Sequence, residues 1–224
     1  MLYIVATPIG NLKDITLRAI EVLKSVDLIA AEDTRHSQNI TREYQITTPL
    51  TSYFEHNKIT KGRHLLELLK QGKDVALVSD AGTPGISDPG FHLIRLAIEN
   101  NIPVTVIPGP TAIIAALVLS GFPTHKFVFE GFLPVKPGAR LKRLKELAAE
   151  KRTIIVYESP HRLLKTLQDI IVVFHDPLLA CVREATKKFE EVKRSRASDL
   201  LAHFSRQKPR GELVLVWNLA FGKP

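Results

Sequence analysis

Short, mainly apolar runs alternate with helical patterns in the first half of the chain, and this alternation limits its possible folds more than any other feature. Within each run the apolar side chains occupy successive positions instead of every second one. Strands of this kind are buried on both faces, as in parallel sheets whose crossover helices cover both sides. The pattern therefore predicts an α/β fold with a mainly parallel sheet. The expected strands are residues 3–6, 28–31, 75–78 and 104–107, and the expected helices are residues 14–24, 59–71 and 90–100.

A second set of runs begins after the middle of the chain. Residues 132–138 contain two prolines and a glycine, which interrupt the pattern just before a basic helical segment at residues 139–151. With 224 residues, the chain is long enough for two small cores. We therefore expect two α/β domains, residues 1–120 and 121–224, joined near residues 120–135. The remaining expected elements are strands at residues 153–157, 178–182, 190–196 and 213–217, the last two of antiparallel character, and a helix at residues 197–206.

Positive charge is concentrated in the second half. The chain has 31 Lys and Arg against 23 Asp and Glu, a formal net charge of +8. Residues 1–120 contain 11 basic and 12 acidic side chains, whereas residues 121–224 contain 20 and 11. This asymmetry favours a small ligand for the first half and a polyanion for the second, although on this fact alone an ordinary solvated surface is the simpler explanation.

The sequence also excludes several classes of protein. The single cysteine, Cys181, allows no disulfide framework and no cysteine-based zinc site, which fits a reducing cytoplasm. The apolar N-terminus has no leading positive charge and meets Pro8 at once, so we interpret it as a first strand and not a signal peptide. The longest apolar stretch, residues 112–119, is far shorter than the roughly 20 residues of a membrane-spanning helix. No histidines have metal-ligand spacing, so we expect no metal and no membrane role.

The densest cluster of glycine and proline, residues 79–90, follows the expected strand at residues 75–78. A loop at the carboxyl end of a parallel strand lies where open α/β sheets bind ligands. The cluster matches neither the phosphate-binding loop that ends in Gly-Lys-Ser/Thr nor the dinucleotide fingerprint G-x-G-x-x-G. A long structural turn is the alternative. The two carboxylates and several backbone amides of this short segment favour a binding loop.

Two further loops have the same placement. Residues 7–12 follow the first strand, and residues 108–112 follow the strand at residues 104–107 and open an apolar helix. The carboxyl ends of parallel strands share one edge of a sheet. The three loops are therefore expected to form one crevice.

A fourth cluster, residues 31–36, ends the second strand with two acids, a hydroxyl and two bases. Capping of the following helix by Asp33 or Thr34 is the more common use of such residues. The planar guanidinium of Arg35 is instead suited to pairing with a phosphate. The sequence leaves both interpretations open.

Five motifs of this chain together resemble a known family: residues 2–12, 31–35, 79–84, 108–110 and 157–162. They are similar to the ribosomal RNA small subunit methyltransferase I family, the bacterial 16S rRNA cytidine 2′-O-methyltransferases, which form a branch of the tetrapyrrole methylase superfamily. The resemblance runs from residue 2 to about residue 217, and it implies a further C-terminal segment that we expect to be absent from this chain.

The resemblance implies a tetrapyrrole-methylase-like fold of two α/β domains, with S-adenosylmethionine in the cleft between them, and a homodimer. Asp80 would meet the methionine ammonium group or a ribose hydroxyl of that cofactor. By motif position, the implied cofactor-binding residues are Pro8, Asp80, Ala81, Gly82, Thr83, Thr111, Ala112, Tyr157 and Ala185.

Transfer of a sulfonium methyl group to a ribose hydroxyl needs no metal and no acid for the leaving group. Holding the 2′-oxygen in line with the methyl carbon can supply about 7 to 11 kcal/mol, and a base would accept the hydroxyl proton. Glu32, Asp33, Asp88 and Glu184 are candidates for that base. Glu32 and Asp33 lead because Arg35 beside them could hold a phosphate, so these three are the expected catalytic residues.

The implied partner is 16S ribosomal RNA within the small subunit, with no role for DNA. Phosphates would be met by basic side chains, although the segment at residues 139–151 could equally be an ordinary wet helix face. Two rival hypotheses remain: a methylase of a tetrapyrrole or another small substrate, and a non-catalytic RNA-binding module. The expected RNA-binding residues are Arg35, Arg140, Lys142, Arg143, Lys187 and Lys188.

Overall fold

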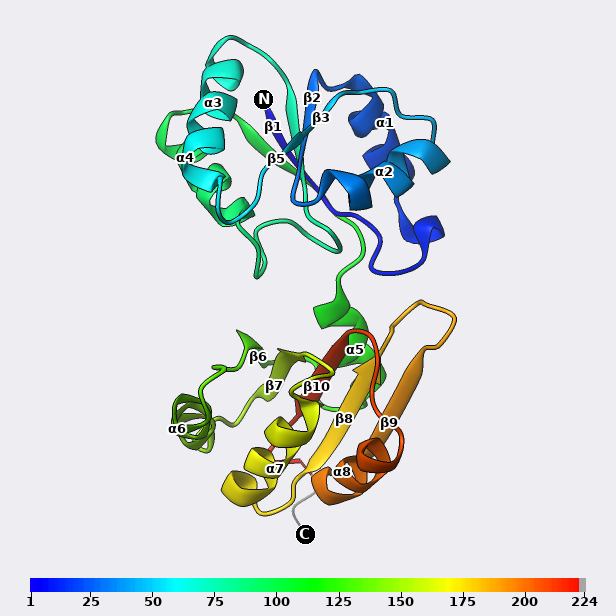
Figure 1. Ribbon diagram of the computed structural model, residues 1–224. Coiled ribbons are helices and arrows are strands. Elements are labelled where there is room, and N and C mark those ends of the chain that lie inside the picture. Colours follow the sequence, from blue (N-terminus) through cyan, green and yellow to red (C-terminus); the bar gives the residue numbers. More distant parts are fainter. Residues whose placement is uncertain (222–224) are drawn as a thin grey trace. The chain divides into compact units, whose positions relative to one another are not determined.

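The computed structural model describes residues 1–221 and divides the chain into two compact units (Figure 1). The first unit is Met1–Thr111, and the second begins at Ala112. The predicted division after residue 120 falls too late, because helix α5 (Ala112–Ser120) packs its apolar side chains on the second sheet. The charge asymmetry is unaffected, since residues 101–120 contain no charged side chain.

The first unit is built on a five-stranded sheet in the order β3-β2-β4-β1-β5, in which every neighbouring pair is parallel. The prediction of a parallel sheet is confirmed. Strand β3 escapes the apolar pattern because it has only three residues, of which two are polar. The strands are β1 (Leu2–Val5), β2 (Leu28–Ala31), β3 (Leu50–Ser52), β4 (Val75–Val78) and β5 (Val104–Ile107).

Helices cover both faces of this sheet, which explains why its central strands are apolar throughout (Figure 1). Apolar residues of α1 (Leu17–Ser25) and α2 (Thr34–Glu43) pack on one face, and those of α3 (Lys58–Lys70) and α4 (Gly90–Glu99) on the other. A 3-10 turn, η1 (Leu12–Asp14), precedes α1.

The start of α1 is set by its cap. The Thr16 hydroxyl accepts a hydrogen bond from the Ala19 amide at 3.1 Å, so the helix begins at Leu17 and not at the predicted residue 14.

The second unit has a mixed five-stranded sheet in the order β6-β7-β10-β8-β9. Only the β6–β7 pair is parallel. The last two strands are antiparallel to their neighbours, as predicted, but β8 lies between them. The strands are β6 (Phe127–Phe132), β7 (Thr153–Glu158), β8 (Leu178–Arg183), β9 (Glu191–Arg196) and β10 (Leu213–Trp217).

One face of the second sheet is covered by α5, and the other by α6 (Pro137–Leu147), α7 (Leu163–Phe174) and α8 (Ala197–Arg206) (Figure 1). The segment that we interpreted as a break between domains instead begins α6. Proline suits the first helical turn, because its missing N–H has no partner there in any case. Among the described residues, no helix is both long and apolar enough to cross a membrane.

Candidate functional site

The loops that follow β1 and β4 are fastened to each other at the carboxyl edge of the first sheet. Thr7 and Gly82 exchange backbone hydrogen bonds of 2.9 and 3.0 Å, which form an isolated antiparallel bridge. The buried Thr7 hydroxyl also donates to the Ser79 carbonyl at 3.2 Å. These bonds fix the Gly/Pro-rich loop against the first loop, as the predicted crevice requires.

Two glycines allow this close approach. Gly82 has a φ of +77°, a conformation that L side chains rarely adopt. At Gly109, in the loop after β5, a Cβ would lie only 3.0 Å from the Cβ of Ala6. Gly82 thus permits the backbone conformation at the bridge to Thr7, and Gly109 leaves room for Ala6 of the first loop.

Asp80 connects the loop after β4 with the end of β2. Its Oδ1 accepts a hydrogen bond from the Asp33 amide at 3.0 Å, while its own amide donates to Glu32 Oε2 at 3.4 Å. Three carboxylates, those of Glu32, Asp33 and Asp80, thus gather at one edge of the sheet. All three side chains are partly exposed.

The pKa values of Glu32 and Asp33 are shifted in opposite directions. Burial raises the pKa of Glu32 above 4.5, and the nearby charges of Asp80 and Asp88 raise it further. The pKa of Asp33 falls to about 2, because the Arg35 side chain and then the Arg35 amide donate hydrogen bonds to it. Glu32 is consequently the better proton acceptor of the pair, since its carboxylate is the more basic.

Asp33 and Arg35 form an ion pair. Arg35 Nε lies 3.1 Å from Asp33 Oδ1, and Nη2 lies 2.7 Å from Oδ2. Asp33 also caps α2 by accepting from the Arg35 amide at 2.9 Å, so the capping interpretation is confirmed. The guanidinium nevertheless remains largely exposed and can meet a further anion.

Asp88 stabilises the loop after β4 through hydrogen bonds to its carboxylate. Its carboxylate accepts from the amides of Gly85, at 2.9 and 3.0 Å, and of Gly90, at 2.7 Å. These bonds occupy the side chain and connect the loop to the start of α4. Asp88 is therefore a structural residue and a weaker candidate for a base.

The centre of the loop keeps unused hydrogen-bond donors. Within residues 1–221, the amides of Ala81 and Thr83 make no hydrogen bond. Pro8 is buried in the adjoining loop, and Thr111 is half-buried at the end of the loop after β5. The first unit thus brings six of the predicted cofactor-binding residues to one sheet edge, namely Pro8, Asp80, Ala81, Gly82, Thr83 and Thr111.

The other three predicted cofactor-binding residues gather in the second unit. Ala112, Tyr157 and Ala185 all pack against the apolar cluster between α5 and the second sheet. The Tyr157 ring makes edge and tilted contacts with Phe129 and Phe132, at centroid distances of 4.9 and 5.6 Å. Burial, with a smaller effect of the Glu212 charge, raises the pKa of Tyr157 to about 12, so its hydroxyl stays protonated at neutral pH.

A buried polar group at the end of β7 was not singled out from the sequence. Glu158 is fully buried and accepts hydrogen bonds from the Ser159 amide at 2.7 Å and from the Thr166 hydroxyl at 2.5 Å. Arg162 lies 3.5 Å from the same carboxylate and donates to the Leu133 carbonyl at 2.6 Å. This group fixes the backbone beside Tyr157. The motif at residues 157–162 was the available signal, but Thr166 on α7 lies outside it.

Arg140 is not available to bind RNA, contrary to our prediction. Its side chain is 4% exposed, and Nε lies 2.6 Å from Asp169 Oδ2 of α7. A buried cation needs such a partner, because desolvation without one is costly. Arg140 therefore fastens α6 to α7.

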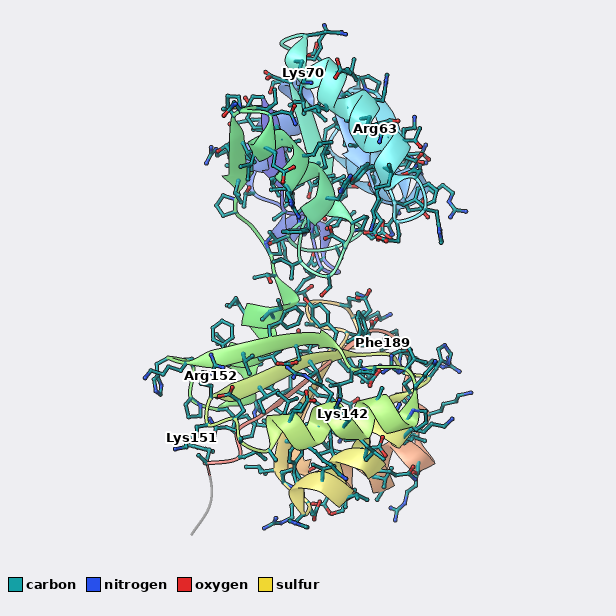
Figure 2. All side chains as sticks on the ribbon, turned by 90° about the vertical axis from the view of Figure 1, so that its left-hand side faces the viewer. Arg63, Lys70, Lys142, Lys151, Arg152 and Phe189 are labelled. Atoms are coloured by element: carbon teal, nitrogen blue, oxygen red, sulfur yellow. The ribbon has the colours of Figure 1, made fainter. Side chains whose placement is uncertain are left out.

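The other predicted RNA-binding cations differ in whether a carboxylate already pairs with them. Arg143 is held by Glu130 and Glu146, and Lys187 by Glu184 and Glu212. Lys142 and Lys188 are exposed and form no ion pair among the described residues; Lys142 can be located on α6 in Figure 2. The second unit thus presents fewer free cations than its sequence contains.

Comparison with known proteins extends the similarity over nearly the whole chain. Residues 1–201 match the family described as Tetrapyrrole (Corrin/Porphyrin) Methylases. The ribosomal RNA small subunit methyltransferase I of Synechocystis sp. is 52% identical over 217 residues, covering 96% of this chain and 78% of that protein. The enzyme of the same name from Thermotoga maritima is 47% identical, covering 96% of each chain.

Solved structures share the fold at much lower identity. A cobalt precorrin-4 methyltransferase is 19% identical with a TM-score of 0.72, covering 99% of this chain and 96% of that one. A diphthine synthase is 14% identical with a TM-score of 0.74, covering 97% and 88%. These likenesses confirm the predicted fold class. The chain is a methyltransferase, and it belongs to the ribosomal RNA small subunit methyltransferase I family within the tetrapyrrole (corrin/porphyrin) methylases.

Proposed function

We propose that this chain transfers the methyl group of S-adenosylmethionine to the ribose 2′-hydroxyl of a cytidine in 16S ribosomal RNA. The substrate is the small ribosomal subunit in the cytoplasm, and the enzyme acts as a homodimer. The observation that carries the proposal is the 52% identity, over 96% of this chain, to a relative named for methylation of small-subunit ribosomal RNA. The positive excess of the second half supports a polyanionic substrate.

The residues at the loop edge of the first sheet fit the proposed cofactor. The free amides of Ala81 and Thr83 can donate to its carboxylate or ribose oxygens, and Gly82 between them has no side chain to cover the backbone. The Asp80 carboxylate can accept from an ammonium group or a ribose hydroxyl. Bound S-adenosylmethionine would supply an electrophilic methyl group on a sulfonium sulfur. Ala112, Tyr157 and Ala185 remain predicted contacts.

Glu32 is the residue that we assign as base. Its raised pKa makes it more basic than Asp33, and hydrogen bonds from Arg35 already occupy both oxygens of the Asp33 carboxylate. Ionised Glu32 would accept the proton of the 2′-hydroxyl as the oxygen bonds to the methyl carbon. The methyl–sulfur bond would break in the same step, with its electron pair left on a neutral thioether, S-adenosylhomocysteine. Asp33 would then position Arg35, whose exposed guanidinium can hold a phosphate beside the reacting ribose.

RNA would be held by the exposed cations Arg35, Lys142 and Lys188, with Arg143 and Lys187 contributing as far as their carboxylate partners allow. Each phosphate that a cation neutralises releases counterions, so affinity should fall steeply as salt concentration rises.

The direct test is a methyl-transfer assay with tritiated S-adenosylmethionine and small ribosomal subunits that lack the modification. Label should enter the 16S RNA at the ribose of a cytidine, where it would survive alkaline hydrolysis as a resistant dinucleotide. Uroporphyrinogen III serves as the alternative acceptor. Label on that small molecule and none on subunits or free 16S RNA would contradict the proposal.

A further inference from the structure

A cavity of about 470 Å³ lies in the second unit and has no role in the function proposed above. It is bounded by the facing ends of β8 and β9, the loop between them, α8, and residues 207–210. Its volume is in the range of small-ligand sites.

The cavity opens on the opposite face of the sheet from the predicted cofactor-binding residues. Phe204 lines it and belongs to the apolar cluster beneath α6, α7 and α8, whereas Ala185 and Tyr157 belong to the cluster beneath α5. Within this unit, the cavity is therefore a separate site.

Phe189 forms an apolar wall at the mouth of the cavity. Its side chain is 66% exposed on the loop after β8 (Figure 2), with the Lys188 ammonium 5.7 Å from the ring centroid. An aromatic ring left in water beside a cation is typical of surfaces on which unpaired bases stack.

Two free cations also line the cavity. Lys208 and Arg210 are exposed and form no ion pair within residues 1–221. The acidic side chains of the cavity are already neutralised: Glu191 accepts from Arg183 at 2.9 Å, and Glu184 accepts from Lys187 at 3.0 Å. The charge left over in the cavity is positive.

The segment that carries these cations is held by hydrogen bonds between its backbone and the side chains of Arg183 and Glu184. Arg183 donates to the Arg210 carbonyl at 3.2 Å, and Glu184 accepts from the Glu212 amide at 3.0 Å. Gly211 has a φ of +81°, and a Cβ there would overlap the Glu184 carboxylate. The loop is thus fitted closely to the end of β8, and this fit holds Lys208 and Arg210 at the same cavity as Phe189.

We propose that this cavity binds one unpaired nucleotide of the RNA substrate, with its base stacked on Phe189 and its flanking phosphates on Lys208 and Arg210. The inference rests on the proposed function and adds to it a nucleotide site on the other face of the second sheet from Tyr157 and Ala185, the predicted cofactor contacts of that sheet. Gln207, whose amide both donates and accepts, lines the cavity and can contact the edge of the base.

The test is fluorescence anisotropy of the full chain with a labelled single-stranded oligoribonucleotide over a range of salt concentrations. Phe189→Ala should weaken binding about 5- to 150-fold without changing the salt slope, and Phe189→Trp should retain the affinity. The matched control is Phe91→Ala, because Phe91 on α4 is 63% exposed and lies in the other unit. Replacing Lys208 and Arg210 together by alanine should lower the slope of log affinity against log salt by about 1.4.

The same variants are assayed for methyl transfer to small subunits, which separates the two proposals. If Phe189→Ala binds RNA no more weakly than Phe91→Ala while methyl transfer by the wild type continues, the nucleotide site is wrong and the proposed function stands. If the wild type neither binds RNA nor methylates subunits, the proposed function is wrong and the nucleotide site with it.

Discussion

The loop edge of the first sheet and the exposed cations of the second unit differ in how their polar groups are held. At the loop edge, Asp80, Glu32 and Asp33 are joined through backbone amides, and glycines bring the loops together. Lys142 and Lys188 are instead exposed side chains without an ionic partner among the described residues. A small ligand requires groups fixed in advance, whereas a polyanion requires mainly density of charge. On this difference we propose a small ligand for the loop edge and a polyanion for the exposed cations of the second unit.

The strongest effect is expected at Glu32. Glu32→Gln keeps the shape of the side chain but removes the proton acceptor, so kcat for methyl transfer should fall about 10²- to 10⁴-fold with cofactor affinity unchanged. In the wild type, activity should fall as the pH is lowered through the raised pKa of Glu32, because only the ionised form accepts a proton. Single-turnover transfer and calorimetry measure the two quantities. A larger loss of kcat in Asp33→Asn would assign the base to Asp33.

Arg140 and Lys142 lie on the same helix and should behave in opposite ways. Arg140→Ala removes a buried side chain and leaves the partly exposed Asp169 without its partner, so it should lower the free energy of unfolding by about 1 to 3 kcal/mol. Lys142→Ala should change stability by less than about 0.5 kcal/mol and lower the salt slope of RNA binding by about 0.7. Urea unfolding followed by Trp217 reports on the second unit, since that buried residue is the only tryptophan of the chain.

If the two variants were equally stable and Arg140→Ala bound RNA more weakly, the structural role of Arg140 would be contradicted and Arg140 would be an RNA-binding residue.

A smaller effect is expected at Arg35. Arg35→Ala should raise the pKa of Asp33 from about 2 toward its ordinary value of 3.8, which carboxyl-detected NMR titration measures. The sign for stability follows: a depressed carboxyl pKa stabilises the folded state above pH 3.8, and this contribution disappears as the pH falls through 2. An unchanged pKa in the variant would show that the pair does not form in solution.

The parts of the fold that the sequence predicts are those that depend on local pattern. Three apolar runs, at β1, β2 and β4, indicate strands buried on both faces, and the glycine-rich loop after Val75–Val78 follows from its position at the end of one of them. The same expectation is wrong for β5, because it is an edge strand on which Val106 is 51% exposed. The shared sheet edge then brings Thr7, Asp80 and Asp33 together without any knowledge of the helices.

The parts that the sequence does not predict depend on contacts between distant segments. In the sequence, Arg140 cannot be told from the exposed basic residues beside it, because its ionic partner Asp169 lies on α7. The burial of Glu158 likewise depends on a hydrogen bond from Thr166 of the same helix. The boundary at Ala112 requires knowing which sheet α5 covers. In each case the local pattern fits two outcomes, and packing decides between them.

The most direct test of the account measures two affinities in two variants. Asp80→Ala should weaken S-adenosylmethionine binding about 10- to 150-fold, since a hydrogen bond to a charged group is worth about 1.5 to 3 kcal/mol, and leave RNA affinity unchanged. Lys142→Glu with Lys145→Glu should weaken RNA binding and leave cofactor affinity unchanged, because both side chains are exposed on α6 and lack ion pairs among the described residues. Calorimetry and anisotropy measure the two affinities. Equal losses of both ligands in both variants would contradict the assignment of cofactor and RNA to different regions.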